Sequence, residues 1–150
     1  MPCGSFNLKS NETAKVLIGA GVGFTPLLSM LESLAQAEIK SPVTFIHCVR
    51  NAEEHAFASH VDSLMTQQEN FTSHAFYSRP TEAHLNLVKT RVHEGRIGQK
   101  CLNDILEDAS ASEFYLCGPK NFTLDIMAML EEMGVAKNQI DFEYFGPQLQ

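Results

Sequence analysis

The sequence has 150 residues, of which 44% are hydrophobic and 19% are charged, and this composition indicates one globular domain with a sizeable core. Its formal net charge of −7 argues against a nucleic-acid partner, since phosphate binding requires clustered Lys and Arg; no apolar run approaches the roughly 20 residues of a membrane-spanning helix, and the first residues lack the pattern of a secretory signal. The four cysteines form no CxxC pair and no zinc-finger spacing with histidines, so we expect reduced thiols in a cytoplasmic protein and no metal site.

Short apolar runs alternate with amphipathic stretches along the chain. The predicted elements, in order, are a lone strand at Pro2–Leu8, a strand at Lys15–Gly19, a helix at Pro26–Ala37, a strand at Val43–Val49, a helix at Glu53–Gln67, strands at Phe71–Tyr77 and Glu113–Cys117, a helix at Lys120–Met133 and a strand at Ile140–Phe145. In the second helix the apolar spacing turns Ala56 and Phe57 inward. Thr81–Ile105 is predicted to be a loop-rich excursion around Glu94–Ile97, with a short helix near Leu102–Leu106.

Strands that alternate with helices predict a parallel sheet covered on both faces. Right-handed crossovers between such strands then give a doubly wound, Rossmann-like α/β domain. We expect about five parallel strands flanked by helices.

A glycine-rich turn, Gly19–Gly23, follows the first buried strand and leads into a helix. Thr25 is suited to cap that helix and Pro26 to occupy its first position, so backbone N–H groups there could receive a phosphate. However, the turn reads GxGxGxTP and departs from the Rossmann fingerprint GxGxxG, and the second strand ends in Arg50 and Asn51 without an acidic residue. The turn alone therefore leaves a ligand-free βα turn open as an alternative.

Five ordered motifs carry a resemblance to a known family. They are GAGVGFTPLLSML from Gly19, HCVRN at His47–Asn51, FYSRP at Phe76–Pro80, FYLCGP at Phe114–Pro119 and EYFGP at Glu143–Pro147. In this order and spacing the chain resembles the NAD(P)H-binding domain of the ferredoxin–NADP reductase-like superfamily, and within it the reductase end of bacterial flavohemoglobins, the nitric oxide dioxygenases.

The resemblance implies a site for NADH or NADPH, between which the sequence does not decide. The residues it places along the pyrophosphate and nicotinamide ribose are Gly19, Gly21, Val22, Gly23, Phe24 and Thr25. Ser78 and Arg79 match a serine–arginine pair that contacts the adenosine ribose or its 2′-phosphate, and Arg50 is a second candidate on that side. The alternative for Arg79 is a solvated loop cation.

The same resemblance assigns the nicotinamide and flavin end of the site. The residues concerned are Cys117, Gly118, Pro119, Glu143, Phe145, Gly146 and Pro147. Cys117 would lie near the nicotinamide, Glu143 would tune the redox site and Phe145 would contact the flavin, with Cys117 and Glu143 as the two candidate catalytic residues. Their alternatives are a small buried thiol, an exposed strand carboxylate and a core aromatic residue.

The resemblance also implies domains beyond this chain. Residues 1–12 resemble the last strand of a preceding FAD-binding barrel, and residues 13–150 form the NAD(P)H-binding domain. In the complete flavohemoglobin, hydride passes from nicotinamide C4 to the FAD, and electrons continue to the haem of a globin domain in cis. Two alternatives remain open: the reductase component of another flavin or iron–sulfur oxidoreductase, and a non-catalytic nucleotide-binding or interaction fragment.

Overall fold

The computed structural model describes residues 13–21, 25–106 and 108–144. Its elements are β1 (Ala14–Ala20), α1 (Thr25–Gln36), β2 (Val43–Val49), the 3₁₀ turn η3 (Ala52–Glu54), α2 (Ala58–Gln67), β3 (Phe71–Tyr77), β4 (Thr90–Glu94), α3 (Gln99–Ile105), η4 (Ala109–Ala111), β5 (Ser112–Gly118), α4 (Lys120–Glu132), η5 (Lys137–Gln139) and β6 (Ile140–Tyr144). The predicted strand at residues 2–8 lies outside the described residues.

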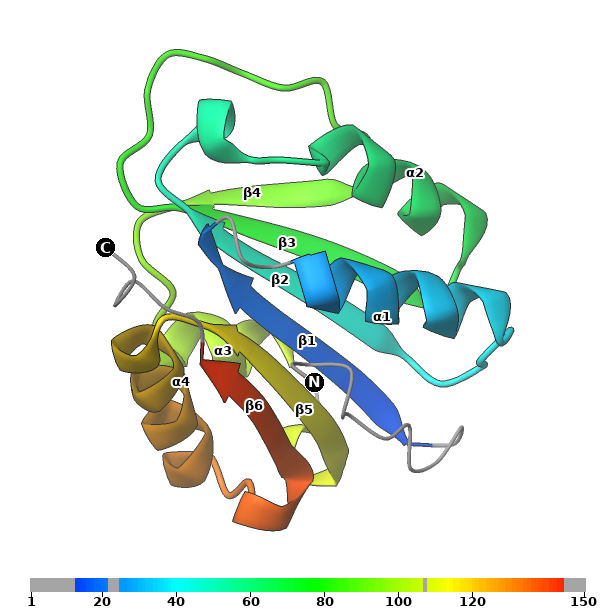
Figure 1. The fold of residues 1–150 in the computed structure, drawn as a ribbon, viewed down its shortest axis with the longest axis vertical. Helices are drawn as coiled ribbons and strands as arrows, with labels where there is room; N and C mark the ends of the chain where they lie inside the picture. The colour runs from blue at the N-terminus through cyan, green and yellow to red at the C-terminus, as the bar shows by residue number, and fades with distance from the viewer. Residues whose placement is uncertain (1–12, 22–24, 107, 145–150) are drawn as a thin grey trace.

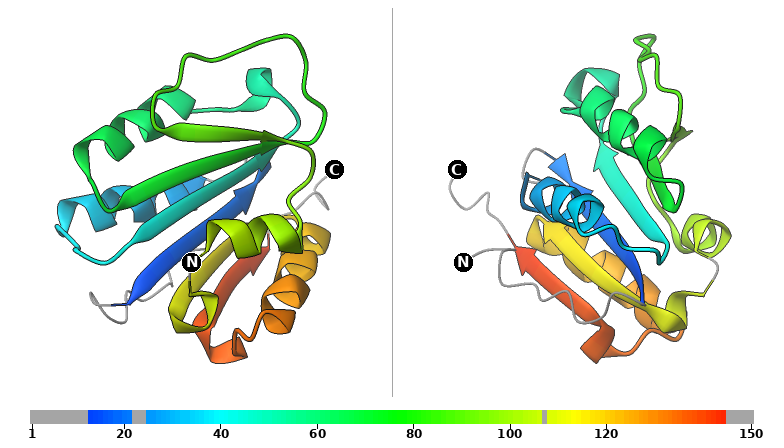
Figure 2. Two further views of the ribbon diagram at one scale, coloured as in Figure 1. Left: turned by 180° about the vertical axis from the view of Figure 1, so that it is seen from behind. Right: turned by 90° about the vertical axis from the view of Figure 1, so that its right-hand side faces the viewer.

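The six strands form one parallel sheet in the order β4-β3-β2-β1-β5-β6. Helices α1 and α2 cover one face, and α3 and α4 cover the other (Figures 1 and 2). The chain proceeds outward from β1 to β4 on one side and then returns to β5 on the other, so the topological switch point lies between β1 and β5. The predicted doubly wound α/β fold is confirmed, with six strands in place of about five.

The two larger hydrophobic clusters of the described core lie one on each face of the sheet. Leu27, Leu31 and Leu34 place one side of α1 against Leu17 and Tyr115 in the first cluster. Each fully buried leucine contributes roughly 2 kcal/mol relative to an exposed one. The second cluster joins α3 and α4 to the opposite sheet face, so both sheet faces are held and only the strand ends are left for loops and ligands.

The strand β4 was not predicted. Its sequence, TRVHE, has no apolar run, and only Thr90 in it is buried. The strand is fixed at its start by Asp62 of α2, whose carboxylate accepts from the backbone N–H groups of residues 88–90 at 2.7–2.8 Å. These bonds lower the pKa of Asp62 although burial opposes them. A contact with a distant helix therefore creates an edge strand that its own residues do not indicate.

The predicted helix at Glu53–Gln67 is wrong over its first turn. Residues 52–54 form the 3₁₀ turn η3, capped by the Asn51 side chain, and α2 begins at Ala58. Between them Phe57 adopts a left-handed conformation with φ of 59°. Ala56 and Phe57 are consequently exposed instead of inward-facing, because the left-handed conformation of Phe57 interrupts the predicted helix before α2 starts.

Candidate functional site

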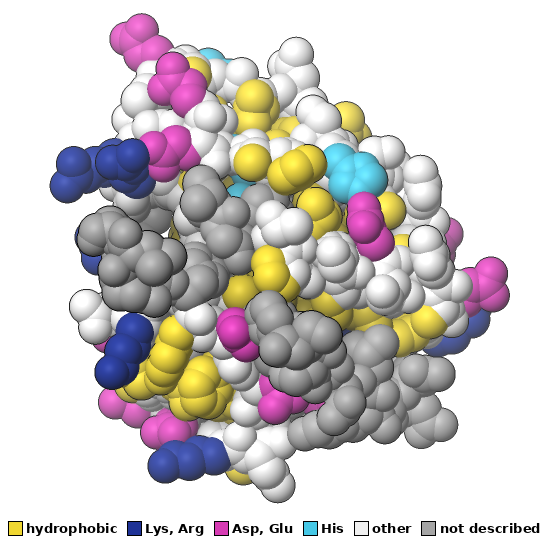
Figure 3. All heavy atoms as spheres, viewed as in Figure 1, with side chains coloured by type: hydrophobic (Ala, Val, Ile, Leu, Met, Phe, Trp, Pro, Cys, Tyr) yellow, Lys and Arg dark blue, Asp and Glu magenta, His cyan; other side chains and the backbone are white. Residues whose placement is uncertain are grey.

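A cavity of about 430 Å³ opens at the carboxyl ends of the parallel strands, a size in the usual range of ligand sites. Its lining comes from Ala20, Gly21, Cys48, Val49, Arg50, Glu54, Phe76, Ser78, Gly95, Arg96, Ile97, Pro119, Phe122, Asp125, Ile126 and Met129. In open α/β sheets ligands bind in this position, beside the switch point. In the view of Figure 3, Lys and Arg side chains lie mainly along the left side of the molecule, with Asp and Glu side chains among them.

Gly21, which directly follows β1, borders this cavity, and a buried histidine binds its carbonyl oxygen. Gly21 has a φ of 71°, a conformation that favours glycine. The Nε2 atom of His47 on β2 lies 3.0 Å from the Gly21 carbonyl oxygen, and His47 is only 2% exposed. Burial lowers the pKa of His47 to about 4, although this hydrogen bond opposes the shift. The ring is therefore neutral near pH 7, and because a carbonyl only accepts, its proton sits on Nε2.

A second buried pair supports His47. The His55 ring lies edge-on to the His47 ring with 5.3 Å between centroids, and His55 Nδ1 is 2.9 Å from the Tyr77 hydroxyl. Burial and the neighbouring His47 lower the pKa of His55 to about 4. Sequence reasoning missed this His47–His55–Tyr77 arrangement. The signal was a histidine within the apolar run of β2, where a buried polar side chain requires a partner.

The predicted adenosine-side residues lie on two neighbouring strand ends. Backbone bonds from Ser78 N to Val49 O (3.0 Å) and from Arg79 N to Arg50 O (2.8 Å) hold the loops after β2 and β3 together. Ser78 and Arg50 line the cavity. Arg79 is exposed and lies outside the lining, so its contact with the adenosine side stays a prediction.

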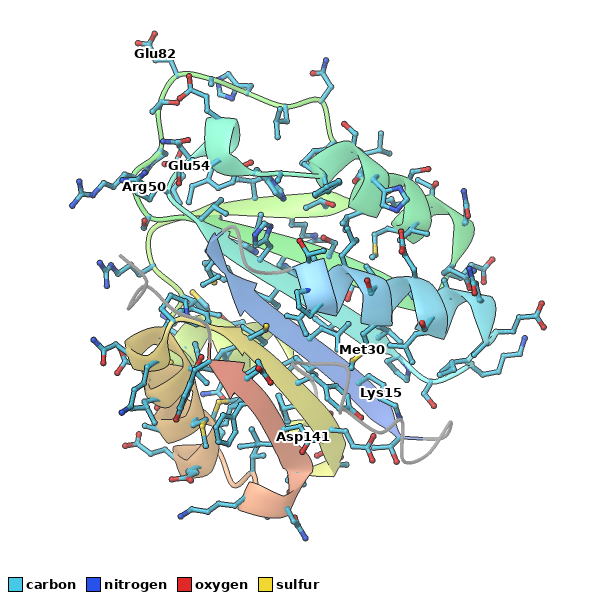
Figure 4. All side chains as sticks on the ribbon, viewed as in Figure 1. Lys15, Met30, Arg50, Glu54, Glu82 and Asp141 are labelled. Carbon is cyan, nitrogen blue, oxygen red and sulfur yellow. The ribbon has the colours of Figure 1, made fainter. Side chains whose placement is uncertain are left out.

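Arg50 is engaged by a carboxylate in the same lining. Its Nε donates to both Glu54 carboxylate oxygens at 3.0 Å, and a terminal guanidinium nitrogen contacts Glu54 Oε2 (Figure 4). The Asn51 side chain accepts from Glu54 N at 3.2 Å and so fixes the start of η3. This pair was not predicted, because the sequence does not show that η3 turns Glu54 back toward Arg50.

The end of β5 brings the two candidate catalytic residues together. Cys117 is fully buried, and the sheet register pairs it with Glu143, which is half-buried. Next to it, a Cβ atom added to Gly118 would lie 2.9 Å from the Phe122 ring, so glycine is needed there for α4 to approach. Pro119 lines the cavity.

The remaining site residues divide into three groups. Gly19 is buried within β1 beside His47 in register, and Thr25 is exposed at the start of α1, one residue before the predicted helix start. Val22, Gly23, Phe24, Phe145, Gly146 and Pro147 lie outside the described residues. Arg96 and Ile97, which follow β4, and Phe122 on α4 line the cavity and were not predicted. They join the site through crossovers that their local sequence does not reveal.

A metal-binding cluster and an ionised thiol at Cys48 are not found among the described residues. Among them no group of three or more His, Cys, Asp or Glu side chains converges as a metal site would. Burial raises the pKa of the Cys48 thiol, which lies in the lining, to about 12, so this cysteine is not a thiolate near pH 7. None of the helices within the described ranges combines the length and apolar character required to traverse a bilayer.

Comparison with known proteins gives a consistent result. A family model described as "Oxidoreductase NAD-binding domain" matches residues 17–127. A flavohemoprotein of Bacillus cereus is 40% identical over 147 residues, covering 97% of this chain and 36% of that protein. The chain thus spans about a third of the length of the curated relatives it matches.

Solved structures agree. The FAD/NAD-binding domain of a nitric oxide dioxygenase from Vibrio cholerae superposes with a TM-score of 0.80 at 32% identity, covering 95% of this chain and 54% of that one. A flavohemoglobin from Malassezia yamatoensis, with bound FAD and heme, gives a TM-score of 0.74 at 25% identity, covering 92% and 33%. The resemblance to flavohemoglobin reductase domains is confirmed.

Proposed function

Because the chain belongs to the oxidoreductase NAD-binding domain family, we propose that it binds a nicotinamide dinucleotide at the carboxyl edge of its sheet and presents it to a flavin on another domain. The observation that carries this proposal is the cavity beside the switch point, bordered by the left-handed Gly21 and by Ser78. An open cavity at strand ends, with a mainly apolar lining that also carries a few polar and charged side chains, suits an extended nucleotide ligand.

Each end of the cavity has a distinct part in this proposal. Gly21 and the N-terminus of α1 receive the pyrophosphate, because a left-handed glycine and exposed helix N–H groups allow close backbone approach. Ser78 and Arg50 bind the adenosine end, with Arg79 as an outer cation. Gly118 and Pro119, beside Cys117 and Glu143, border the nicotinamide end.

When bound, the dinucleotide supplies a hydride from nicotinamide C4, a step that depends on stacking and distance more than on an acid–base pair. The residues of this chain would bind, orient and shield the nucleotide. Cys117 and Glu143 are neighbours in the sheet register at the end where the nicotinamide would lie, and Phe145 is proposed to contact the flavin.

We further propose that the chain serves a flavohemoglobin: residues 1–12 would end an FAD-binding barrel, a globin would hold haem, and the complete cytoplasmic enzyme would convert nitric oxide to nitrate. The support is the match over 97% of this chain to proteins nearly three times as long, and the solved relative with bound FAD and heme.

The proposal is tested by titrating the 150-residue chain with NADH and NADPH in a calorimeter, with GTP as a control for unspecific phosphate binding. We expect saturable binding of at least one dinucleotide and none of GTP. Ser78→Ala should weaken the affinity about fivefold, as the loss of one ligand hydrogen bond does, while Ser33→Ala on the exposed side of α1 should not change it. Absence of saturable binding to both dinucleotides would refute the proposed function.

A further inference from the structure

The charged side chains that line the cavity balance one another. Arg50 and Arg96 supply two cations, and Glu54 and Asp125 supply two carboxylates. A cavity built for a doubly charged phosphate would be expected to carry an excess of free cations. The charges of the lining side chains therefore bear on whether NADH or NADPH fits the cavity better.

Of the two lining arginines, Arg50 is the one that a carboxylate of the lining already engages. Its guanidinium faces Glu54 with Nε 3.0 Å from each carboxylate oxygen and a terminal nitrogen in contact with Oε2. This two-pronged contact uses the same donor fork that would grip a phosphate. Arg50 is thus satisfied before any ligand arrives.

The position of Glu54 is fixed through its own backbone N–H group, which Asn51 binds. Asn51 accepts from Glu54 N at 3.2 Å as the cap of η3. The loop that carries Arg50 is in turn joined to the Ser78–Arg79 loop by two backbone hydrogen bonds of 3.0 and 2.8 Å. Glu54 and Ser78, the residue proposed to contact the adenosine ribose, line the same cavity.

We propose that Glu54 is a specificity-determining residue that makes this cavity select NADH over NADPH; the inference rests on the proposed function and deepens it. A ribose 2′-hydroxyl can donate to the Glu54 carboxylate. A 2′-phosphate carries nearly two negative charges near pH 7 and either lies against this carboxylate or displaces it from Arg50. Selection therefore works by repelling the competitor as well as by binding the preferred ligand.

Two other cations act in the opposite direction. Arg96 lines the cavity, and Arg79 is exposed just outside it. Both attract a 2′-phosphate from solvent-exposed positions, where screening reduces the attraction. The Glu54 side chain is also partly exposed, at 37%, but it lies within the lining, whereas Arg79 does not. The two cations reduce the discrimination without reversing it, so we expect NADH to bind about tenfold more tightly than NADPH, the effect of one close like-charge contact near a surface.

The experiment measures Kd for NADH and NADPH on the 150-residue chain and on Glu54→Gln. The variant keeps the shape of the side chain but releases Arg50, so NADPH should bind about tenfold more tightly than before and the preference should disappear. Glu53→Gln is the matched control, because Glu53 belongs to the same 3₁₀ turn, is exposed, lies outside the lining and changes the net charge equally. It should preserve the preference.

The outcomes separate this inference from the function on which it rests. If neither dinucleotide binds the unmodified chain, both the proposed function and the selectivity are overturned. If both bind equally, if NADPH binds more tightly, or if Glu54→Gln leaves the ratio of the two Kd values unchanged, only the role of Glu54 is overturned. Circular dichroism confirms that each variant is folded, and Arg50→Gln, which leaves Glu54 without its cation, should increase the preference for NADH.

Discussion

The side of the sheet where the parallel strands begin (the amino edge) and the side where they end (the carboxyl edge) use polar side chains in different ways. At the amino edge they bind the backbone of neighbouring loops: Asn70 Nδ2 donates to the carbonyls of Ile39 and Ser41 at 2.7 and 2.6 Å, and Gln139 Nε2 donates to those of Ser110 and Ser112 at 2.8 Å. At the carboxyl edge the polar side chains surround a cavity. The amino edge should therefore contribute mainly to stability, and the carboxyl edge mainly to binding.

The largest expected effect is on the amino edge. Lys15 Nζ, whose side chain is fully buried, lies 3.1 Å from Glu113 Oε1 across the β1–β5 register (Lys15 is labelled in Figure 4). Glu113→Ala removes the carboxylate and leaves the buried ammonium with the Thr13 carbonyl oxygen, 2.8 Å away, but without the opposite charge of Glu113, so we expect unfolding in urea to show a loss of about 3 kcal/mol. The Kd for NADH should not change.

A double variant provides the control. Lys15→Met together with Glu113→Gln removes both charges but keeps an acceptor for the Tyr115 hydroxyl, which donates to Glu113 at 3.2 Å, and stability should return to within about 1 kcal/mol of the original. A change in NADH affinity in either protein would contradict the separation of the two edges.

The next effect concerns pH and the carboxyl edge. The folded-state pKa of His47 is about 4, below its ordinary value of 6.5. Between these values the unfolded chain binds a proton that the folded chain does not, so stability is full above pH 6.5 and falls as the pH decreases toward 4. For His47 alone the decrease from pH 7 to pH 5 is about 2 kcal/mol.

His47→Gln tests this assignment. Its amide can still donate toward the Gly21 carbonyl, but it cannot titrate. The loss of stability between pH 7 and pH 5 should therefore be about 2 kcal/mol smaller than in the unmodified chain. An unchanged pH dependence, or a His47 resonance that titrates near pH 6.5 by NMR, would show that the ring is not buried in its neutral form.

The same contrast explains what could be predicted from sequence. The buried strands β1, β2, β3 and β5 are rich in apolar, β-branched and aromatic residues, and each is predicted to within about a residue at either end. β4 was missed, because Asp62 on α2 holds it at the sheet edge. The first turn of the second predicted helix was wrong, because the apolar spacing of Ala56 and Phe57 does not reveal a left-handed residue.

The residues of the site also differ in whether the sequence could predict them. Motif resemblance identified lining residues that follow a strand directly, such as Gly21, Ser78 and Pro119. It missed His47, which acts from within a strand, and Arg96, which follows the unpredicted β4. Such residues join the site only through strand order and register, which local sequence does not specify.

The smallest expected effect on stability comes from replacing one of two glycines by alanine. This pair of variants gives the sharpest test of the difference between the amino and carboxyl edges. Gly21 and Gly134 both have positive φ, 71° and 94°, and a Cβ atom added to either would meet no atom of the described residues within 4 Å. Replacement by alanine therefore costs only backbone strain, about 1 kcal/mol or slightly more at each position. Gly134 lies in the loop between α4 and β6, at the amino edge, whereas Gly21 borders the cavity.

The two alanine variants should thus lose similar stability but differ in binding. Gly21→Ala should weaken NADH affinity at least tenfold, because relief of the strain would rotate the peptide that His47 holds and move the turn away from the phosphates. Gly134→Ala should bind NADH as the unmodified chain does. Calorimetric titration at a temperature where both variants are folded measures the difference. Equal affinities would mean that the backbone conformation at Gly21 serves folding alone, and that the phosphates are bound elsewhere on the carboxyl edge.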